Sequence, residues 1–238
     1  MIDLYVIRHA RASAAAAEYD HLHEEGLVQA RLLGEHLGTL AEHFDAVFVG
    51  PHLRQRETLR IARSAASEVG AGWPEAVTID GLAEAPYDLL VKKYLVPRLQ
   101  SDATLLGLAQ TLGAASDAAM RDAAMRAIWD YMVVLWSSGE IVGEDIETSQ
   151  VFCARVDAAL ARVRGSVGDG QRVMVMTSNG VIGHILTLAA GVPPPPTEAT
   201  HKLYNTSISI FELHGQRTVL RSANQVSHLR DTGLLTIL

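Results

Sequence analysis

Arginine and histidine stand together at the end of the first apolar run of this sequence. Residues 4–7 are apolar, and Arg8 and His9 follow them directly. A neutral imidazole can attack phosphorus as a nucleophile. A guanidinium group beside it chelates phosphate oxygens in forked geometry and keeps its charge at any relevant pH. Taken alone, the pair fits two interpretations equally: a phosphoryl site in which His9 is the candidate nucleophile, or a capped structural histidine beside an ion pair.

Polar residues also follow three later apolar runs. The run 45–50 leads to Arg54, the run 77–80 leads to Glu84, and the run 172–176 leads through Thr177-Ser178-Asn179-Gly180 into a helix. Ligands of open α/β sheets bind beyond the carboxyl ends of the strands, so we expect these groups to converge. A helix N-terminus offers N–H groups to an anion, and a carboxylic acid can protonate a leaving oxygen. Arg54 at the start of a helix is electrostatically unfavourable alone, which indicates an anion partner.

The rest of the pattern predicts strands that alternate with helices. Apolar runs predict buried strands, and a period of 3.6 residues predicts helices over 24–41, 54–68, 148–164 and 181–190. Residues 207–213 and 218–223 alternate like an antiparallel pair. In the first helix we expect one buried face, formed by Leu27, Ala30, Leu33, Leu37 and Leu40. The fold class is α/β, a three-layer α/β/α sandwich on a mostly parallel sheet.

The middle of the chain breaks this alternation. From about residue 86 to 145 the periodicity is helical and no strand is indicated. The amphipathic stripe here consists of Met120, Ala124, Ile128, Tyr131 and Leu135. We expect a single domain over 1–238 that carries this stretch as a helical insertion, which can close over a site as a lid.

Composition excludes several classes of protein. Of 238 residues, 20 are Lys or Arg and 27 are Asp or Glu, and the net charge of −7 disfavours nucleic acid and acidic membranes as partners. Cys153 is the single cysteine, so no internal disulfide forms and a reducing compartment is indicated. The start of the chain lacks a signal-peptide pattern. The uncharged window 173–197 is interrupted by polar residues and by four prolines. We expect a cytoplasmic protein and leave its oligomeric state open.

Five segments, in order, resemble the phosphoglycerate mutase-like branch of the histidine phosphatase superfamily. Arg8-His9-Ala10 is similar to the family's Arg-His-Gly signature, and Glu24-Glu25-Gly26-Leu-Val-Gln29-Ala30 to the opening of its first helix. The segment from Pro51 to Thr58 resembles the segment that carries the second phosphate-binding arginine. Thr177-Ser178-Asn179-Gly180 stands at the family's Ser-His-Gly, and Asn205-Thr206-Ser207 resembles its entry to a late strand.

This resemblance implies a role for each site residue. His9 becomes phosphohistidine, Arg8 and Arg54 clamp the phosphoryl group, and Glu84 is the acid–base residue. Ser178, Asn179 and Gly180 complete the phosphate-binding set. Two residues depart from the family pattern. Ala10 replaces a glycine, and Asn179 replaces the second histidine; its amide can donate a hydrogen bond but cannot become a cation.

The function expected is a metal-independent phosphatase that acts on a phosphorylated small molecule or phosphoprotein, with no cofactor. The alternative is a weakened or inactive phosphate-binding relative of the same fold, motivated by Asn179 and Ala10. A mutase is less favoured, because it must protect its phosphorylated form from water. The stretch Asp20-His21-Leu22-His23-Glu24 resembles a metal cluster only in composition, and we interpret it as a polar loop before the first helix.

Overall fold

The computed structural model describes residues 1–13, 20–40, 43–192 and 203–237. The prolines at 193–196 lie outside the described residues. The chain divides into two compact units, one formed by residues 1–84 and 155–238 and the other by residues 85–154. The second unit contains the whole stretch of about 86–145 that the sequence predicts as a helical insertion. Among the described helices, none combines the length and the apolar character that a membrane crossing requires.

The first unit is built on a six-stranded mixed sheet in the order β3-β2-β4-β1-β5-β6. Its strands are β1 (Ile2–Arg8), β2 (Ala46–Val49), β3 (Ala76–Thr78), β4 (Arg172–Thr177), β5 (Ile208–His214) and β6 (Arg217–Gln225). The first four run parallel, and β5 and β6 are antiparallel. The predicted α/β class with a mostly parallel sheet is confirmed.

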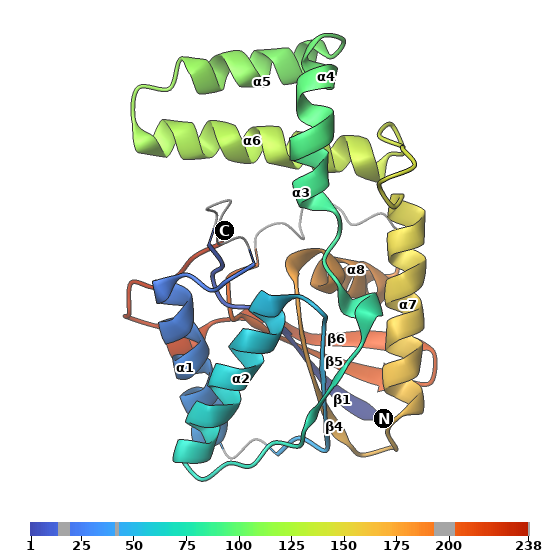
Figure 1. Ribbon diagram of the computed structural model, residues 1–238. Helices are drawn as coiled ribbons and strands as arrows, with labels where there is room; N and C mark the ends of the chain where they lie inside the picture. The colour runs from blue at the N-terminus through green and yellow to red at the C-terminus, as the bar shows by residue number, and fades with distance from the viewer. Residues whose placement is uncertain (14–19, 41–42, 193–202, 238) are drawn as a thin grey trace. The chain divides into compact units, whose positions relative to one another are not determined.

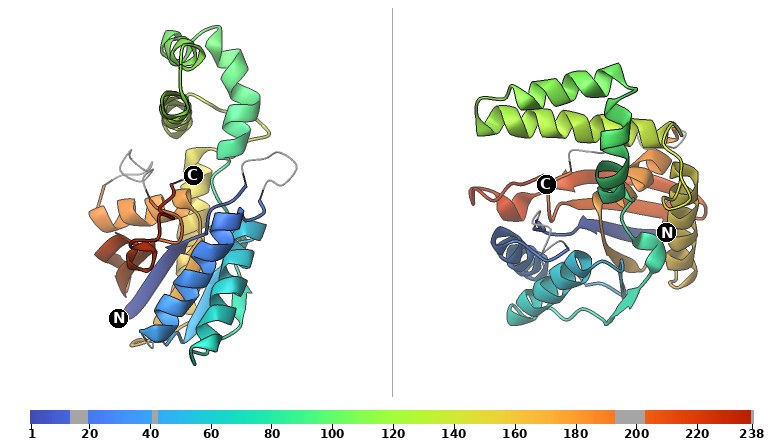
Figure 2. Two further views of the ribbon diagram at one scale, coloured as in Figure 1. Left: turned by 90° about the vertical axis from the view of Figure 1, so that its left-hand side faces the viewer. Right: turned by 45° about the horizontal axis from the view of Figure 1, so that its top comes forward.

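Helices cover both faces of this sheet (Figures 1 and 2). They are α1 (Glu24–Thr39), α2 (Leu53–Glu68), α7 (Ser149–Gly165) and α8 (Asn179–Ala190). Alternate residues of each central strand pack against α1 and α2; Tyr5 and Ile7, for example, share a core cluster with Leu33 and Leu59. The intervening residues, such as Leu4 and Val6, are equally buried on the other face. The central strands are buried on both sides, as their continuous apolar runs predict.

The buried face of α1 differs from the one predicted. Ala30, Leu33 and Leu37 are buried, but Leu27 and Leu40 are exposed. Small residues complete the face instead, because α1 and α2 approach very closely. A Cβ at Gly34 would lie 2.0 Å from the carbonyl oxygen of Ala62. Hydrophobicity alone could not locate a face that contains glycines.

The second unit is helical in its described part, as the sequence predicts. It contains α3 (Tyr87–Leu89), a π-helical turn η2 (Leu90–Tyr94), α4 (Leu95–Leu99), α5 (Ala103–Gly113), α6 (Ala118–Ser137) and the start of α7. Trp136 is fully buried, with its ring 5.9 Å from that of Tyr87 and 5.8 Å from that of Phe152. Ala124, Ile128 and Leu135 are buried as predicted, Tyr131 is half-buried, and Met120, in the first turn of α6, is exposed.

Candidate active site

The parallel strands place their carboxyl ends at one edge of the sheet. Arg8 is the register partner of Thr177, and the N–H of His9 donates to the carbonyl of Thr177 at 2.9 Å. The N–H of Gly50 donates to the carbonyl of Met176 at 3.0 Å. The turns that follow β1, β2 and β4 therefore start side by side, and this edge holds the residues that the sequence predicts for the site.

The imidazole of His9 is fixed in one tautomer. Its Nδ1 lies 2.7 Å from the carbonyl oxygen of Ala10, which can only accept, so Nδ1 carries the proton. Nε2 then presents its lone pair and accepts from Nε of Arg54 at 3.2 Å. Burial, followed by the charges of Arg54 and Arg8, lowers the pKa of His9 well below its ordinary value. The ring is neutral at physiological pH, as a nitrogen nucleophile must be.

Arg8 is a buried cation that pairs mainly with backbone carbonyl groups. Its Nη1 donates to the carbonyl oxygens of Leu203 and Ile237, the latter at 2.5 Å. Its Nε is buried and has no hydrogen-bond partner among the described residues. Burial lowers the pKa of Arg8 to about 10; Glu84 raises it and Arg54 lowers it further. The group stays protonated at neutral pH, and a buried N–H without a partner is costly unless a ligand accepts from it.

Arg54 has an anion partner within the chain. Its Nη1 donates to Oδ1 of Asp20 at 2.7 Å. Oδ2 of the same carboxylate accepts from the N–H of Leu53 at 2.7 Å, in the first turn of α2. We predicted an anion here from the arginine at a helix start, and the described residues supply one. Asp20 belongs to the stretch that the sequence predicts as a polar loop, and no sequence pattern indicates its contact with Arg54.

Glu84 lies against the start of α8. Its Oε1 accepts from the N–H of Gly180 at 2.9 Å. The hydroxyl of Ser178 is fully buried and accepts from Nε2 of Gln55 at 2.7 Å. The side-chain oxygen of Asn179 is buried without a hydrogen-bond partner among the described residues. The backbone N–H of Gly180 and the hydroxyl of Ser178 are thus engaged by the protein, whereas the amide oxygen of Asn179 is not.

Two further side chains hold the backbone around His9. Oγ1 of Thr58 accepts from the N–H of Ala10 at 3.0 Å, and Nδ2 of Asn205 donates to the carbonyl of His9 at 3.1 Å. Ala10 is not among the described non-glycine residues with positive φ. Its methyl group therefore causes no backbone strain at the glycine position of the motif.

Arg155 holds the segment that carries Glu84. Its Nη1 donates to the carbonyls of Gly81 and Ala83 at 3.0 and 2.9 Å, and its Nη2 donates to the carbonyl of Glu84 at 3.1 Å. The approach is close, because a Cβ at Gly81 would lie 2.8 Å from the carbonyl oxygen of Arg155. No local sequence pattern distinguishes Arg155 from the other arginines of α7, so the sequence does not predict this role.

The metal-like stretch before α1 has other contacts. Nδ1 of His23 accepts from the N–H of Glu25 at 3.3 Å and caps α1, while Asp20 pairs with Arg54. Within the described ranges no group of three or more His, Cys, Asp or Glu side chains is arranged to hold a metal ion.

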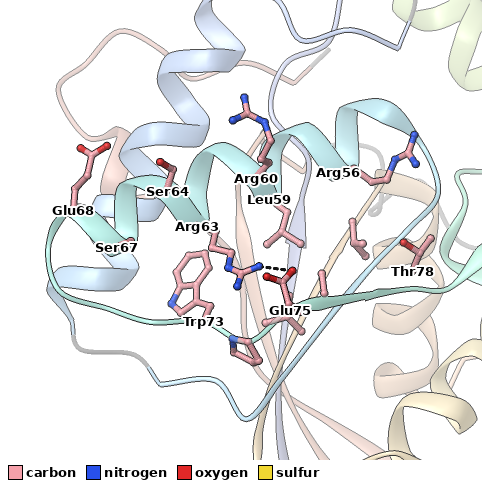
Figure 3. Close-up of a pocket in the computed structure, with 14 residues that line it drawn as sticks. Arg56, Leu59, Arg60, Arg63, Ser64, Ser67, Glu68, Trp73, Glu75 and Thr78 are labelled. Atoms are coloured by element: carbon pink, nitrogen blue, oxygen red, sulfur yellow. Dashed lines mark ion pairs between the residues drawn. The ribbon is translucent and has the colours of Figure 1, made fainter.

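A pocket of about 750 Å³ lies elsewhere, between α2 and the edge strand β3. Its lining includes Trp73, Thr78 and three arginines of α2. Figure 3 shows the guanidinium of Arg63 reaching Glu75 across this pocket; the two groups are 2.7 Å apart. None of its lining residues belongs to the cluster around His9. The pocket therefore takes no part in the candidate active site.

Comparisons with known proteins find a matching family model and structures of similar fold. The family model of the histidine phosphatase superfamily (branch 1) matches residues 4–91 and 115–226. Among solved structures, YhfR of Bacillus stearothermophilus has a TM-score of 0.64 at 18% identity, covering 96% of this chain and 100% of that one. Phosphoserine phosphatase of Entamoeba histolytica, complexed with 3-phosphoglyceric acid, has a TM-score of 0.61 at 18% identity. The match covers 96% of this chain and 100% of that chain.

A phosphoglycerate mutase of Bacillus anthracis is similar as well. Its TM-score is 0.62 at 17% identity, and the match covers 96% of this chain and 95% of that chain. At these identities the likeness shows the fold alone. No curated protein matches the chain.

Proposed function

Because the chain belongs to branch 1 of the histidine phosphatase superfamily, we propose that it hydrolyses a phosphomonoester through a phosphohistidine at His9, without a metal ion. The observation that carries the proposal is the state of His9. It is buried and neutral, with Nδ1 bonded to the carbonyl of Ala10 and Nε2 facing Arg54. A structural histidine gains nothing from two arginines whose charges oppose its protonation.

In the first half of the reaction, Nε2 of His9 forms a bond to phosphorus and the ester P–O bond breaks. The leaving oxygen takes the proton of the Glu84 carboxyl group. As Nε2 becomes bonded to phosphorus, the ring acquires positive charge. The carbonyl of Ala10 stabilises that charge because it accepts from Nδ1–H.

In the second half, the Glu84 carboxylate takes a proton from water, and the water oxygen attacks phosphorus. The P–N bond breaks, inorganic phosphate leaves, and neutral His9 and protonated Glu84 are restored. Nε of Arg8 and the guanidinium of Arg54 stabilise the equatorial oxygens in both steps. The buried Nε of Arg8 gains the acceptor that the described residues do not provide.

For the substrate we propose a phosphorylated small molecule or a phosphoprotein. Two arginines and a histidine recognise only the phosphoryl end, so they leave the rest of the substrate open. Structures of similar fold include a phosphoserine phosphatase with phosphoserine and one with 3-phosphoglyceric acid. Such complexes are consistent with a compact phosphorylated acid as the first class to test.

The test is phosphate release from a generic aryl phosphate in the presence of a chelator. Wild type should be active, and His9→Ala should lose at least about 10³-fold in kcat because the nucleophile is gone. The acidic limb of the pH profile should lie below about pH 6.5, the ordinary pKa of histidine. His43→Ala is the control, since that side chain is 74% exposed. Equal activity of wild type and His9→Ala would refute the phosphohistidine.

The second candidate is a phosphate-binding relative with weak or no turnover. It is favoured by Asn179, which stands at the position of the second motif histidine and whose buried oxygen lacks a partner among the described residues. An amide there cannot supply positive charge to the phosphoryl group. Tight binding of phosphoesters by calorimetry, with no phosphate released from any of a broad panel, would establish this function instead.

A further inference from the structure

The carboxylate of Asp20 binds both the side chain and the backbone at the start of α2. Oδ1 accepts from Nη1 of Arg54 at 2.7 Å and from the backbone N–H of Arg54 at 3.4 Å. Oδ2 accepts from the N–H of Leu53 at 2.7 Å. Asp20 has a φ of 79°, a left-handed conformation that aspartate tolerates better than most residues. These contacts hold the carboxylate against Nη1 of the Arg54 guanidinium.

The opposite side of that guanidinium faces the nucleophile. Nε of Arg54 donates to Nε2 of His9 at 3.2 Å, while Nη1 is bonded to Asp20. A guanidinium is planar, so fixing one nitrogen and the backbone beside it restricts where the others point. Asp20 thereby determines how Arg54 meets a phosphoryl group on His9, although its own contacts are with Arg54, Leu53 and His52.

Asp20 also sets the charge of the site. Arg8 and Arg54 are both buried, and Arg8 donates to the carbonyls of Leu203 and Ile237. The Asp20 carboxylate compensates Arg54, and Glu84 acts electrostatically on Arg8. Nδ1 of His52 lies 4.0 Å from Oδ2 of Asp20. A phosphoryl dianion must share Arg54 with this carboxylate. Removing the charge of Asp20 should therefore strengthen binding of the anion while leaving Arg54 less well oriented.

We propose that Asp20 is a positioning residue, which orients Arg54 toward His9 and competes with bound phosphate for the same guanidinium. The predicted effect of Asp20 on turnover rests on the proposed function. The predicted effect of Asp20 on phosphate binding does not depend on that function. The two effects have opposite signs. A residue that only stabilised the loop or the start of α2 would weaken both binding and turnover, so the pair of measurements separates the roles.

The experiment compares wild type, Asp20→Asn and Asp20→Ala. We expect kcat for an aryl phosphate to fall about 10-fold in Asp20→Asn and further in Asp20→Ala, which loses the acceptor oxygens as well. The Kd for inorganic phosphate, measured by calorimetry, should fall about 10-fold in Asp20→Asn, meaning tighter binding. Glu57→Gln is the control, because it removes one negative charge from α2 at an exposed ion pair with Arg60. It should change kcat and the Kd for phosphate less than about twofold.

Two results would overturn the proposal. One is an unchanged kcat in both Asp20 variants of an active enzyme, and the other is weaker or unchanged phosphate binding in Asp20→Asn. The Arg54→Ala background adds a check, because there Asp20→Asn should no longer tighten phosphate binding. If wild type binds phosphate but shows no turnover that depends on His9, the proposed function fails while the binding measurements still decide the role of Asp20.

Discussion

Replacing Arg155 by alanine should release the segment that carries Glu84. The guanidinium donates to three successive parts of that segment, the carbonyls of Gly81, Ala83 and Glu84, at 2.9 to 3.1 Å. A hydrogen bond to a charged group contributes about 1.5–3 kcal/mol net. The three bonds share one guanidinium and are not additive, so we expect the free energy of unfolding to fall by about 2–4 kcal/mol.

The loss should appear in both stability and activity. For a chain of this size the melting temperature falls by about 2–4 °C per kcal/mol, which gives roughly 5–15 °C for Arg155→Ala. In the proposed mechanism Glu84 is the general acid, and general acid catalysis contributes about 10²–10⁴-fold. Displacing Glu84 should lose part of that contribution, so we expect kcat to fall about 10- to 100-fold. Glu84 should also lose its contact with the N–H of Gly180. Substrate binding through Arg8 and Arg54 should change little.

The assay is thermal unfolding together with kcat and KM for an aryl phosphate. Arg162→Ala is the matched control, because Arg162 lies on the same helix with an exposed side chain. Arg155→Lys keeps the charge but cannot donate in a fork to three carbonyls, so it should recover only part of the loss. The reasoning is refuted if Arg155→Ala keeps the wild-type kcat at a temperature where it is fully folded.

Two further perturbations address Asn179 and pH. If Asn179 contacts the phosphoryl group as the proposed function requires, Asn179→His should raise kcat about 10-fold or more, because a histidine there can be cationic. An unchanged or lower rate would mean that the pocket is built around the amide. Burial, followed by the charge of His36, lowers the pKa of His228 to about 4. In the unfolded chain the pKa of a histidine is about 6.5, so between pH 4 and 6.5 the unfolded state binds more protons than the folded state. The contribution of neutral His228 to stability is therefore present above pH 6.5 and lost as pH falls toward 4. The free energy of unfolding, measured by denaturant titration, should fall between about pH 7 and pH 4.5. This fall should be about 2–3 kcal/mol smaller in His228→Gln than in wild type. Equal falls in the two proteins would contradict the lowered pKa of His228.

Much of the fold follows from local sequence patterns. Apolar runs located the parallel strands, because a strand buried on both faces has no polar positions. The helices begin within two residues of their predicted starts, and the antiparallel pair β5 and β6 is where alternation placed it. Helix faces were less well predicted. In α1, Gly34 and Gly38 lie against α2 and form part of the buried face, whereas Leu27 and the C-cap residue Leu40 are exposed.

The candidate site was predictable where each residue directly follows a strand. Arg8 ends β1 and His9 follows it, and the segments after β2 and β4 lead to Arg54 and Asn179 at the starts of α2 and α8, so sheet topology brings them to one edge. What these side chains bond to was not predictable in this way. The anion expected for Arg54 is Asp20, and the hydroxyl of Ser178 and the N–H of Gly180 are engaged by Gln55 and Glu84.

The sequence by itself thus determined the elements, their order and the chemical groups at the strand ends, because periodicity and turn residues are local properties of a chain. Only the tertiary structure decided which residues hold those groups in place. Asp20 and Arg54 are 34 residues apart, Arg155 and Gly81 are 74 apart, and Asn205 and His9 are 196 apart. Such pairs have no spacing that a sequence pattern can express, and they meet because packing of helices on the sheet brings distant turns together.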